Sequence, residues 1–385
     1  MDEKKSQIPS CCTPVQEKPL ETPCCCAPVL ESKTLHSLRK ESWVKGMVDT
    51  SVGAIPIVST ILQFSDRWDR WKARWTIGRM RYSVEPGLYA VGQPNSESPV
   101  LVSANYKMSF DRLRSELSGI DAWILVIDTK GINVWCSAGK GTFGADEIVK
   151  RIQEVGLEKV VSHRRLILPQ LSAPGVCAHE VKQRIGFRVM YGPIRAKDIR
   201  QYLESGMKAS PEMRRVHFRI KDRIVLIPTE IMAFLKYAML GAVILFLLSG
   251  LNSHGVSFAN MLTTGVWSGI LLLVTYVMVA TLTPMLLPWL PGRAFSLKGA
   301  WIGLVVSVVV LGITGSRELI SSNLFIAISW FLILSAVSSF VAMNFTGAST
   351  YTSLSGVRKE MKVAVPLQIA GTAVGLGLWI AGRFV

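Results

Sequence analysis

The sequence has few histidines and few acidic residues, and neither a secretory signal nor a disulfide pattern is evident. Its 385 residues include five histidines and 27 acidic residues against 43 Lys and Arg, which gives a net charge of +16. No run of Lys and Arg alternates with aromatic residues as a groove-reading element would, so we expect no nucleic-acid partner. Residues 1–33 begin with charged and polar residues instead of an apolar stretch, so we expect no signal peptide.

The seven cysteines form neither a disulfide framework nor a ferredoxin-type cluster pattern. Two of them, Cys136 and Cys177, stand alone. The other five lie in a Pro-rich tail: Cys11, Cys12, Cys24, Cys25 and Cys26. We expect this tail, residues 1–33, to be disordered because it cannot bury a core. Its paired thiols suit the capture of a soft ion such as Hg(II), or the tail has no dedicated role.

Apolar residues are concentrated in the last 157 residues, so we expect residues 229–385 to form an all-α transmembrane domain of five helices. Each apolar stretch is about 18 to 23 residues long, enough to cross a hydrocarbon core of roughly 30 Å. The five stretches are Ile231–Leu251, Asn260–Leu282, Leu297–Thr314, Leu324–Met343 and Val363–Ile380.

The distribution of basic residues orients these spans. The first connection, 252–259, has no Lys or Arg, whereas the fourth contains Arg358, Lys359 and Lys362. The positive-inside rule then places the N-terminal head in the cytoplasm and the C-terminus outside a plasma (inner) membrane, as a multi-pass protein. Apart from Lys236 near one interface, no ionisable residue lies in the middle of a span, which argues against an ion pathway.

Residues 34–228 are expected to form one cytoplasmic α/β domain of Rossmann-like type. Short apolar runs alternate with amphipathic segments, which is typical of a mostly parallel sheet covered on both faces. The expected strands are Val100–Ala104, Ala122–Asp128, Arg165–Ile167 and Arg188–Tyr191, with another after Pro86. The expected helices are Ser109–Leu117, Ala145–Val155, Ala178–Ile185 and Ala196–Leu203.

Trp68, Trp71 and Trp75, spaced by three and four residues, share one helical face if a helix forms there. The sequence favours a packing role for this face over a stacking platform.

Ligands of parallel α/β sheets bind at the carboxyl ends of the strands. Small or polar residues follow each expected strand and are candidate binding residues. These are Asn105, Tyr106, Thr129, Gly131, Ser172, Ala173, Gly175, Tyr191, Gly192 and Pro193.

The segment between the strand at 122–128 and the helix at 145–155 contains a single cysteine, Cys136. We expect this cysteine to lie in a glycine-bearing turn, where free backbone N–H groups and the following helix dipole favour a thiolate. A thiol held in this way can become a metal ligand. The whole segment is a candidate site: Asn133, Val134, Trp135, Cys136, Ser137, Ala138, Gly139, Lys140, Gly141, Thr142, Phe143 and Gly144.

Other interpretations of this segment fit less well. A phosphate-binding loop needs glycine at Val134 and Ser or Thr directly after Lys140. Gly139, Gly141 and Gly144 match the dinucleotide spacing, but no acidic residue follows at the required distance. A nucleophilic cysteine would need His163 or His179 nearby, which the sequence does not place. A buried structural cysteine stays open.

The segment also resembles the cap-helix motif of the mercury-methylating corrinoid proteins, membrane-anchored relatives of the corrinoid iron–sulfur protein of the acetyl-CoA pathway. The long string N-V-W-C followed by G-K-G-T-F-G carries most of the resemblance. It extends to Arg74–Tyr82, Pro86–Gly92, Ala104–Lys107 and the five spans. The Cys-rich tail departs from the family, and the histidine-containing cobalamin motif D-x-H-x-x-G is absent.

This resemblance implies a cobalamin-type corrinoid whose cobalt is held by the Cys136 thiolate as lower axial ligand. Gly139, Gly141 and Gly144 would allow close approach of the ring, and Lys140 would neutralise a polar corrin group or stay solvated. Trp135 and Phe143 would flank the ring, unless Trp135 points into the core. No other cofactor is implied.

The implied activity is that of a corrinoid-dependent methyltransferase that passes a cobalt-bound methyl group to Hg(II), giving methylmercury. The implied partners are a ferredoxin-like [4Fe-4S] iron–sulfur protein, a methyl-tetrahydrofolate-type donor and membrane lipid. Two alternatives remain open: a methyl carrier of one-carbon metabolism that serves a partner enzyme, and a non-catalytic cobamide-binding membrane protein.

Overall fold

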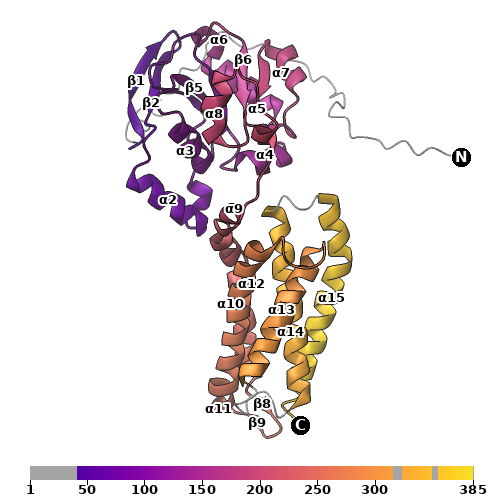
Figure 1. The fold of residues 1–385 in the computed structure, drawn as a ribbon. Helices are drawn as coiled ribbons and strands as arrows, with labels where there is room; N and C mark the ends of the chain where they lie inside the picture. Colours follow the sequence, from indigo (N-terminus) through magenta and orange to yellow (C-terminus); the bar gives the residue numbers. More distant parts are fainter. Residues whose placement is uncertain (1–40, 315–322, 349–353, 385) are drawn as a thin grey trace, which may run out of the picture. The chain divides into compact units, whose positions relative to one another are not determined.

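The computed structural model describes residues 41–314, 323–348 and 354–384, and the chain divides into two compact units (Figure 1). Unit 1 comprises Met1–Ala73 and Ile77–Val216, and unit 2 comprises Arg74–Thr76 and His217–Val385. The Cys-rich tail and its five candidate mercury ligands lie outside the described residues.

One mixed sheet forms the centre of unit 1. In the described part of the chain it has seven strands: β1 (Val44–Thr50), β2 (Gly53–Val58), β3 (Gly87–Val91), β4 (Val100–Ala104), β5 (Ala122–Ile127), β6 (Arg165–Leu168) and β7 (Arg188–Tyr191). Their order across the sheet is β1-β2-β3-β5-β4-β6-β7. The strands β5, β4, β6 and β7 pair in parallel, as predicted.

Two features of the sheet differ from the prediction. Strand β3 is antiparallel to β5, and β1 and β2 form an antiparallel hairpin that the sequence patterns do not reveal. The hairpin escapes prediction because Lys45, Gly46, Asp49 and Pro56 interrupt its apolar runs. Lys45, Gly46 and Asp49 lie in β1, at the edge of the sheet, where such residues are tolerated.

The helices of unit 1 agree closely with prediction where apolar periodicity is strong. They are α2 (Phe64–Arg74), α3 (Lys107–Glu116), α4 (Val134–Lys140), α5 (Ala145–Val155), α6 (Leu157–Val160), α7 (Ala178–Ile185) and α8 (Ile199–Glu204). Short 3₁₀ turns occur at Arg79–Arg81, Gln170–Ser172, Ala196–Asp198 and Glu212–Arg214. Helix α4 is not predicted, since its seven residues carry no apolar repeat.

Both faces of the sheet are covered by helices, as predicted. Successive residues of the buried strand β5 point to opposite faces. Leu125 packs with Ile148 of α5 on one face, and Ile124 packs with Phe110 of α3 on the other. Helix α7 joins the first cluster and α8 the second.

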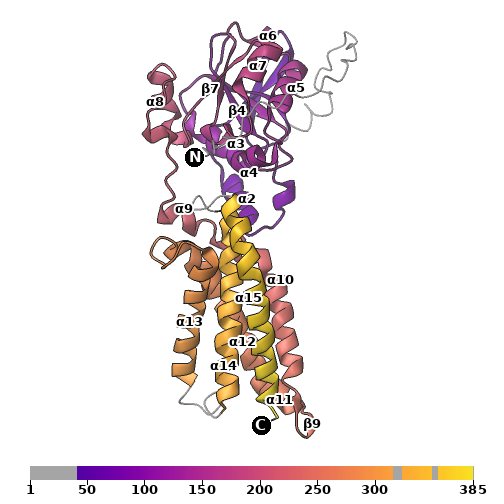
Figure 2. The ribbon, with the colours of Figure 1, turned by 90° about the vertical axis from the view of Figure 1, so that its right-hand side faces the viewer.

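Unit 2 contains long helices that run side by side (Figure 2). Its elements are α9 (Ile220–Ile224), α10 (Ile227–Leu248), β8 (Leu251–Asn252), β9 (Gly255–Val256), α11 (Phe258–Asn260), α12 (Val266–Leu286), α13 (Phe295–Thr314), α14 (Leu324–Asn344) and α15 (Leu354–Ala381). A short π-helix spans Met261–Gly265, and a 3₁₀ helix spans Phe345–Ala348.

Among the described residues, four stretches of helix are long and apolar enough to cross a membrane: Ile220–Leu248, Phe258–Leu286, Leu324–Asn344 and Ser355–Ala381. They correspond to four of the five predicted spans. The remaining one, predicted over Leu297–Thr314, contains a shorter apolar helix, Phe295–Val309, so a fifth span stays a prediction.

Small residues allow close packing of α13 on α14. A Cβ atom on Gly299 would lie 2.3 Å from the Ser338 carbonyl oxygen, and one on Gly303 would lie 2.7 Å from that of Leu334. Glycines spaced four residues apart are typical of helix contacts within membranes.

The fourth predicted connection is partly helical. Helix α15 begins at Leu354, so Arg358, Lys359 and Lys362 belong to the helix and not to a loop. Lys and Arg have good helix propensity, so their charge does not prevent them from lying in a helix. Glu360 lies among them and accepts a hydrogen bond from the Ser296 N–H group at 2.5 Å.

Candidate functional site

The predicted binding residues gather at the carboxyl ends of the parallel strands. Strand β5 lies on one side of β4, and the next strand along the chain, β6, lies on the other side of β4. The order of the strands therefore reverses at β4. Such a reversal opens a crevice at the carboxyl ends of the strands that flank it, where ligands of α/β proteins bind. Asn105 follows β4, Thr129 follows β5, and the turn with Ser172 follows β6.

Asn105 fastens the loop after β5 to the end of β4. Its side-chain oxygen accepts hydrogen bonds from the Thr129 N–H (3.1 Å), the Thr129 hydroxyl (2.8 Å) and the Gly131 N–H (3.0 Å). Its side-chain nitrogen donates to Asp128 at 3.1 Å. Asn105 and Thr129 are buried. They therefore support the site from beneath and fix where α4 begins.

Helix α4 is capped at both ends by residues of its own segment. The Asn133 side chain accepts a hydrogen bond from the Cys136 N–H at 3.0 Å, as an N-cap does. Gly141 ends the helix with a left-handed φ of 79°, which favours glycine. The N–H groups of Thr142 and Phe143 donate to the Ser137 carbonyl at 3.0 and 3.2 Å.

Cys136 therefore lies in the first turn of a helix, and the expectation of a glycine-bearing turn is wrong for it. Its own N–H group is engaged by Asn133 and does not point freely toward sulfur. Glycine appears only later in the segment, from Gly139 onward. The signals for a helix were present, since Asn at the N-cap and Gly after the last turn are strong boundary residues.

The two faces of α4 have opposite characters. Ser137 and Ala138 are buried, and the Ser137 hydroxyl donates to the carbonyl oxygens of Asn133 at 2.7 Å and Val134 at 3.0 Å. The exposed residues are Trp135, Cys136, Gly139 and Lys140. Trp135 is 39% exposed, so the interpretation of Trp135 as a core residue is wrong.

The surface beside Cys136 is open. Gly139 lies one turn after Cys136, and a Cβ atom added to it would meet no other atom within 4 Å. Glycine inside a helix costs roughly 0.5–1 kcal/mol relative to alanine. Neither packing nor backbone geometry therefore requires glycine at this position.

The loop after β6 packs against the inner side of α4. A Cβ atom on Gly175 would lie 2.6 Å from the Phe143 carbonyl oxygen and 2.7 Å from that of Ala138, so only glycine fits. The buried Ser172 hydroxyl donates to the Pro169 carbonyl at 2.8 Å, and the Tyr191 hydroxyl donates to the Val176 carbonyl at 2.8 Å. These residues shape the support of α4.

The remaining candidates also have structural surroundings. Phe143 is fully buried in the core, so its side chain does not flank a ligand at the surface. Gly192 donates its N–H group to the Leu168 carbonyl at 2.8 Å, and Pro193 beside it is buried. Ala173, Thr142 and Gly144 are half-buried.

A segment missed by the site prediction borders the loop after β5. The Tyr82 carbonyl accepts from the Lys107 N–H at 3.1 Å, and Ser83 forms a β-bridge with Tyr106. A Cβ atom on Gly131 would lie 3.9 Å from the Met80 carbonyl oxygen. Met80 itself is 84% exposed. An apolar side chain so exposed beside a candidate site is the signal that could have identified this segment.

The nucleophilic-cysteine interpretation lacks a base. Within the described part of the chain, neither His163 nor His179 forms a hydrogen bond to Cys136; His163 contacts the Ser98 carbonyl at 2.9 Å instead. Among the described residues no group of three His, Cys, Asp or Glu side chains could hold a metal ion. One thiolate is sufficient, however, for a metal that a cofactor brings with it.

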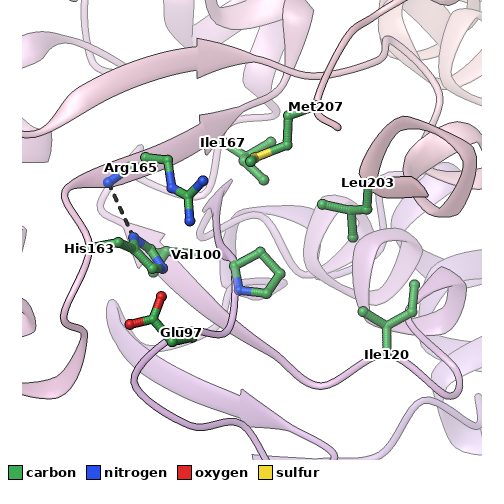
Figure 3. Close-up of a pocket in the computed structure, with 9 residues that line it drawn as sticks. Glu97, Val100, Ile120, His163, Arg165, Ile167, Leu203 and Met207 are labelled. Atoms are coloured by element: carbon green, nitrogen blue, oxygen red, sulfur yellow. Dashed lines mark hydrogen bonds between the residues drawn. The ribbon is translucent and has the colours of Figure 1, made fainter. Parts of the chain in front are cut away.

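A pocket of about 290 Å³ lies at the other end of the sheet (Figure 3). His163 and Arg165 line it where β6 begins, and Val100 lines it where β4 begins. The other lining residues are Glu97, Pro99, Ile120, Ile167, Leu203 and Met207. Cys136 follows the opposite, carboxyl end of β5, so this pocket is separate from the candidate site.

Comparison with known proteins points to one group of enzyme complexes. Residues 72–203 match a family described as the CO dehydrogenase/acetyl-CoA synthase delta subunit. A curated relative, the acetyl-CoA decarbonylase/synthase complex subunit gamma of Methanopyrus kandleri, is 30% identical over 183 residues, which cover 46% of this chain and 38% of the relative. The subunit gamma of Archaeoglobus fulgidus is 33% identical over 132 residues, covering 34% and 28%.

The gamma 2 subunit of Methanosarcina thermophila is 34% identical over 124 residues, covering 31% of this chain and 26% of the relative. The chain thus spans less than two fifths of the length of these curated relatives. The family match includes β4 to β7 and α4 with Cys136, and it ends before the apolar helices of unit 2. Most of unit 1 is therefore similar to part of the gamma subunits of acetyl-CoA decarbonylase/synthase complexes, as the resemblance to the acetyl-CoA pathway protein predicts.

Proposed function

We propose that unit 1 binds a cobalamin-type corrinoid on the exposed face of α4 and that the protein acts as a membrane-anchored methyl carrier. The observation that carries this proposal is the exposed Cys136 thiol on a helix inside the segment that matches the acetyl-CoA synthase family. A bound corrinoid would supply a cobalt centre that accepts a methyl group from a donor and gives it up to an acceptor.

The residues of α4 fit such a group. The thiolate of Cys136 is a suitable axial ligand because soft sulfur donors bind metal strongly once deprotonated. The missing side chain at Gly139 leaves room for a flat ring beside the sulfur. Trp135 and Lys140 are exposed on the same helix and would contact the rim of the ring and its polar substituents.

The rest of the site holds α4 in place. Asn133 fixes the first turn, Asn105 fixes the loop that precedes it, and Gly175 lets the loop after β6 approach its inner face. A ligand that must bind one sulfur needs a helix that does not shift, because metal–ligand distances tolerate little change.

The proposal has two forms, which differ in the molecule that accepts the methyl group. The relatives are named as subunits of acetyl-CoA decarbonylase/synthase complexes, which favours a carrier that delivers methyl to a partner enzyme. The string from Asn133 to Gly144 resembles the mercury-methylating proteins, and the apolar helices extend beyond the family match. These two features support Hg(II) as the acceptor in the second form, with methylmercury as product.

Further parts of the proposal follow from the sequence. The methyl donor would be a methyl-tetrahydrofolate-type pterin, and a ferredoxin-like [4Fe-4S] protein would reduce the cofactor, since the chain has no such cluster pattern. The head would face the cytoplasm, because basic residues dominate it and the fourth connection.

The test follows the fate of one methyl group. The full chain, loaded with corrinoid and chemically methylated, is incubated with Hg(II) or with an acetyl-CoA synthase partner, and methylmercury and acetyl-CoA are measured. Cys136→Ala should abolish transfer in both reactions, while Cys177→Ala, which alters the other described free thiol, should retain it.

Methylmercury formation without the partner would establish the second form, and transfer only to the partner would establish the first. A chain that binds no corrinoid, or equal losses for the two cysteine variants, would contradict the proposal.

A further inference from the structure

Helix α2 has its aromatic face on the outside. Its buried residues are Asp66 and Ala73, seven positions apart and thus on one side of the helix. Phe64, Trp68 and Trp71 lie on the opposite side at the spacing of one helical face, with exposed fractions of 80%, 49% and 48%. A helix of a soluble domain normally buries its aromatic face, so α2 has the reverse arrangement.

The attachment of α2 to the sheet domain uses charge. Asp66 accepts hydrogen bonds from Lys107 at 2.7 Å and from Arg114 at 2.9 Å, both from the buried side of α3. Asp66 also accepts from the Gln63 N–H at 3.0 Å. The polar side therefore fixes the orientation of α2, and this attachment does not need the aromatic side.

The predicted packing role of the tryptophan face is wrong for Trp68 and Trp71, which stack on each other at the surface. Their ring centroids are 5.0 Å apart and their planes are inclined by 12°. The apolar surface continues at both ends of the helix, with Ile61 68% and Ile77 56% exposed.

Basic residues border this surface. Residues 61–81 contain six Lys and Arg and two acidic residues. On a helical projection Arg67 and Arg74 flank the aromatic face on one side and Lys72 flanks it on the other. Aromatic rings bordered by cations are typical of helices that lie in the interface of a bilayer with anionic lipids.

The end of α2 is tied to the beginning of a candidate membrane span. The Arg74 carbonyl accepts a hydrogen bond from the Thr229 hydroxyl at 2.9 Å, and both residues belong to unit 2. Thr229 lies in the first turn of α10, within the span Ile220–Leu248.

We propose that the face formed by Phe64, Trp68 and Trp71 lies in the headgroup region of the bilayer that the helices of unit 2 cross. The indole rings occupy the boundary between headgroups and acyl chains, where tryptophan is enriched in membrane proteins. Arg67, which is exposed beside this face, contacts lipid phosphates. The partner of this surface is phospholipid, because exposed indole rings beside a cationic side chain suit the interface of an anionic bilayer, and the same chain contains candidate membrane spans.

The test uses the full chain in nanodiscs that contain anionic phosphatidylglycerol. The photoreactive residue p-benzoylphenylalanine replaces Trp68 in one variant and Phe64 in a second; the matched control replaces Lys150, an exposed residue of α5. After irradiation, intact-protein mass spectrometry measures the added mass. We expect phospholipid adducts as the main product at positions 64 and 68, and none at position 150.

Adducts to a second protein chain at positions 64 and 68, in place of lipid, would overturn the proposal in favour of a protein interface. Absence of any lipid adduct at both positions, in variants that retain the circular dichroism of the unaltered chain, would also overturn it. A lipid adduct at position 150 equal to that at position 68 would do the same, because labelling would then be unspecific.

Discussion

Helices α4 and α5 follow one another after strand β5, yet they are held in opposite ways. Helix α5 buries Ala145, Ile148, Val149 and Ile152 against the sheet and exposes Asp146, Lys150 and Glu154. Helix α4 buries only Ser137 and Ala138, and it exposes a tryptophan and a cysteine. Its position depends on a cap and on neighbouring turns. The difference indicates that α5 serves the fold, whereas the exposed residues of α4 are available for binding.

Helix α2 extends this contrast. It is attached through Asp66, and its aromatic residues face outward. In both α4 and α2 the polar contacts needed for attachment are separate from the exposed residues. Each pair of roles can therefore be tested by a separate substitution.

The largest expected effect on stability concerns the charged attachment of α2. Asp66→Ala removes one of the two buried carboxylates, Asp66 and Asp111, that pair with Lys107 and Arg114, and loss of one member of a buried ion pair costs about 3–5 kcal/mol. Hydrogen exchange in the full chain should show faster exchange throughout α2 and little change in α5. Equal changes in both helices would contradict the separate attachment.

Acid should weaken the same attachment. Burial raises the pKa of Asp66, but hydrogen bonds from Lys107 and Arg114 outweigh it, so the pKa lies below its ordinary value of 3.8. A lowered carboxylate pKa stabilises the fold above pH 3.8, and this stabilisation is lost as the pH falls through the folded pKa. Protection of α2 amides should fall in that range, and Asp66→Asn should remove this dependence.

Ile148→Ala in α5 should lower the stability of the fold without lowering corrinoid binding. Truncation of a fully buried isoleucine should lower the free energy of unfolding by about 2–5 kcal/mol. The folded protein should still bind the corrinoid, since Ile148 does not contact the exposed face of α4. Urea unfolding and the cobalt-to-protein ratio measure the two properties. Loss of cobalt at a temperature where the variant is folded would show that α5 takes part in binding.

Asn133→Ala removes the cap of α4. Loss of an N-cap costs about 1 kcal/mol, so α4 amides should exchange faster and bound cobalt should decrease. Asn133→Ser retains an oxygen acceptor and should behave like the unaltered chain. If the two variants retain equal amounts of cobalt, the cap does not position Cys136.

Gly139→Ala should have the smallest effect on stability, and it should change stability and cobalt binding in opposite directions. Alanine should stabilise α4 by roughly 0.5–1 kcal/mol because it has the higher helix propensity. If a flat ring lies against this position, the same methyl group should lower cobalt retention. Lys150→Ala is the control, since Lys150 is an exposed residue of α5 outside the candidate site. A more stable helix with unchanged cobalt would place the ring elsewhere.

The sequence predicts the strands β4 to β7 and the helices α5 and α7 well, because they have continuous apolar runs or a clear apolar face. It predicts poorly where structure depends on few residues. Asn133 and Gly141 are the boundary residues of α4, but two capping residues around a short segment without apolar periodicity do not distinguish a helix from a turn.

Periodicity shows which residues share a helical face, but it does not show whether that face points to the core or to solvent. The spacing of Trp68 and Trp71 correctly predicts one helical face, but it does not reveal that Asp66 on the opposite side makes the tertiary contact. Likewise, the position of Phe143 next to Gly144 gave no sign that its ring is buried under the sheet while Trp135 is exposed.

The most direct test of the central claim is cobalt X-ray absorption of the corrinoid-loaded full chain. We predict one sulfur neighbour of cobalt in the unaltered protein and in Cys177→Ala, and none in Cys136→Ala. Absence of sulfur in the unaltered protein, or its persistence in Cys136→Ala, would contradict the account.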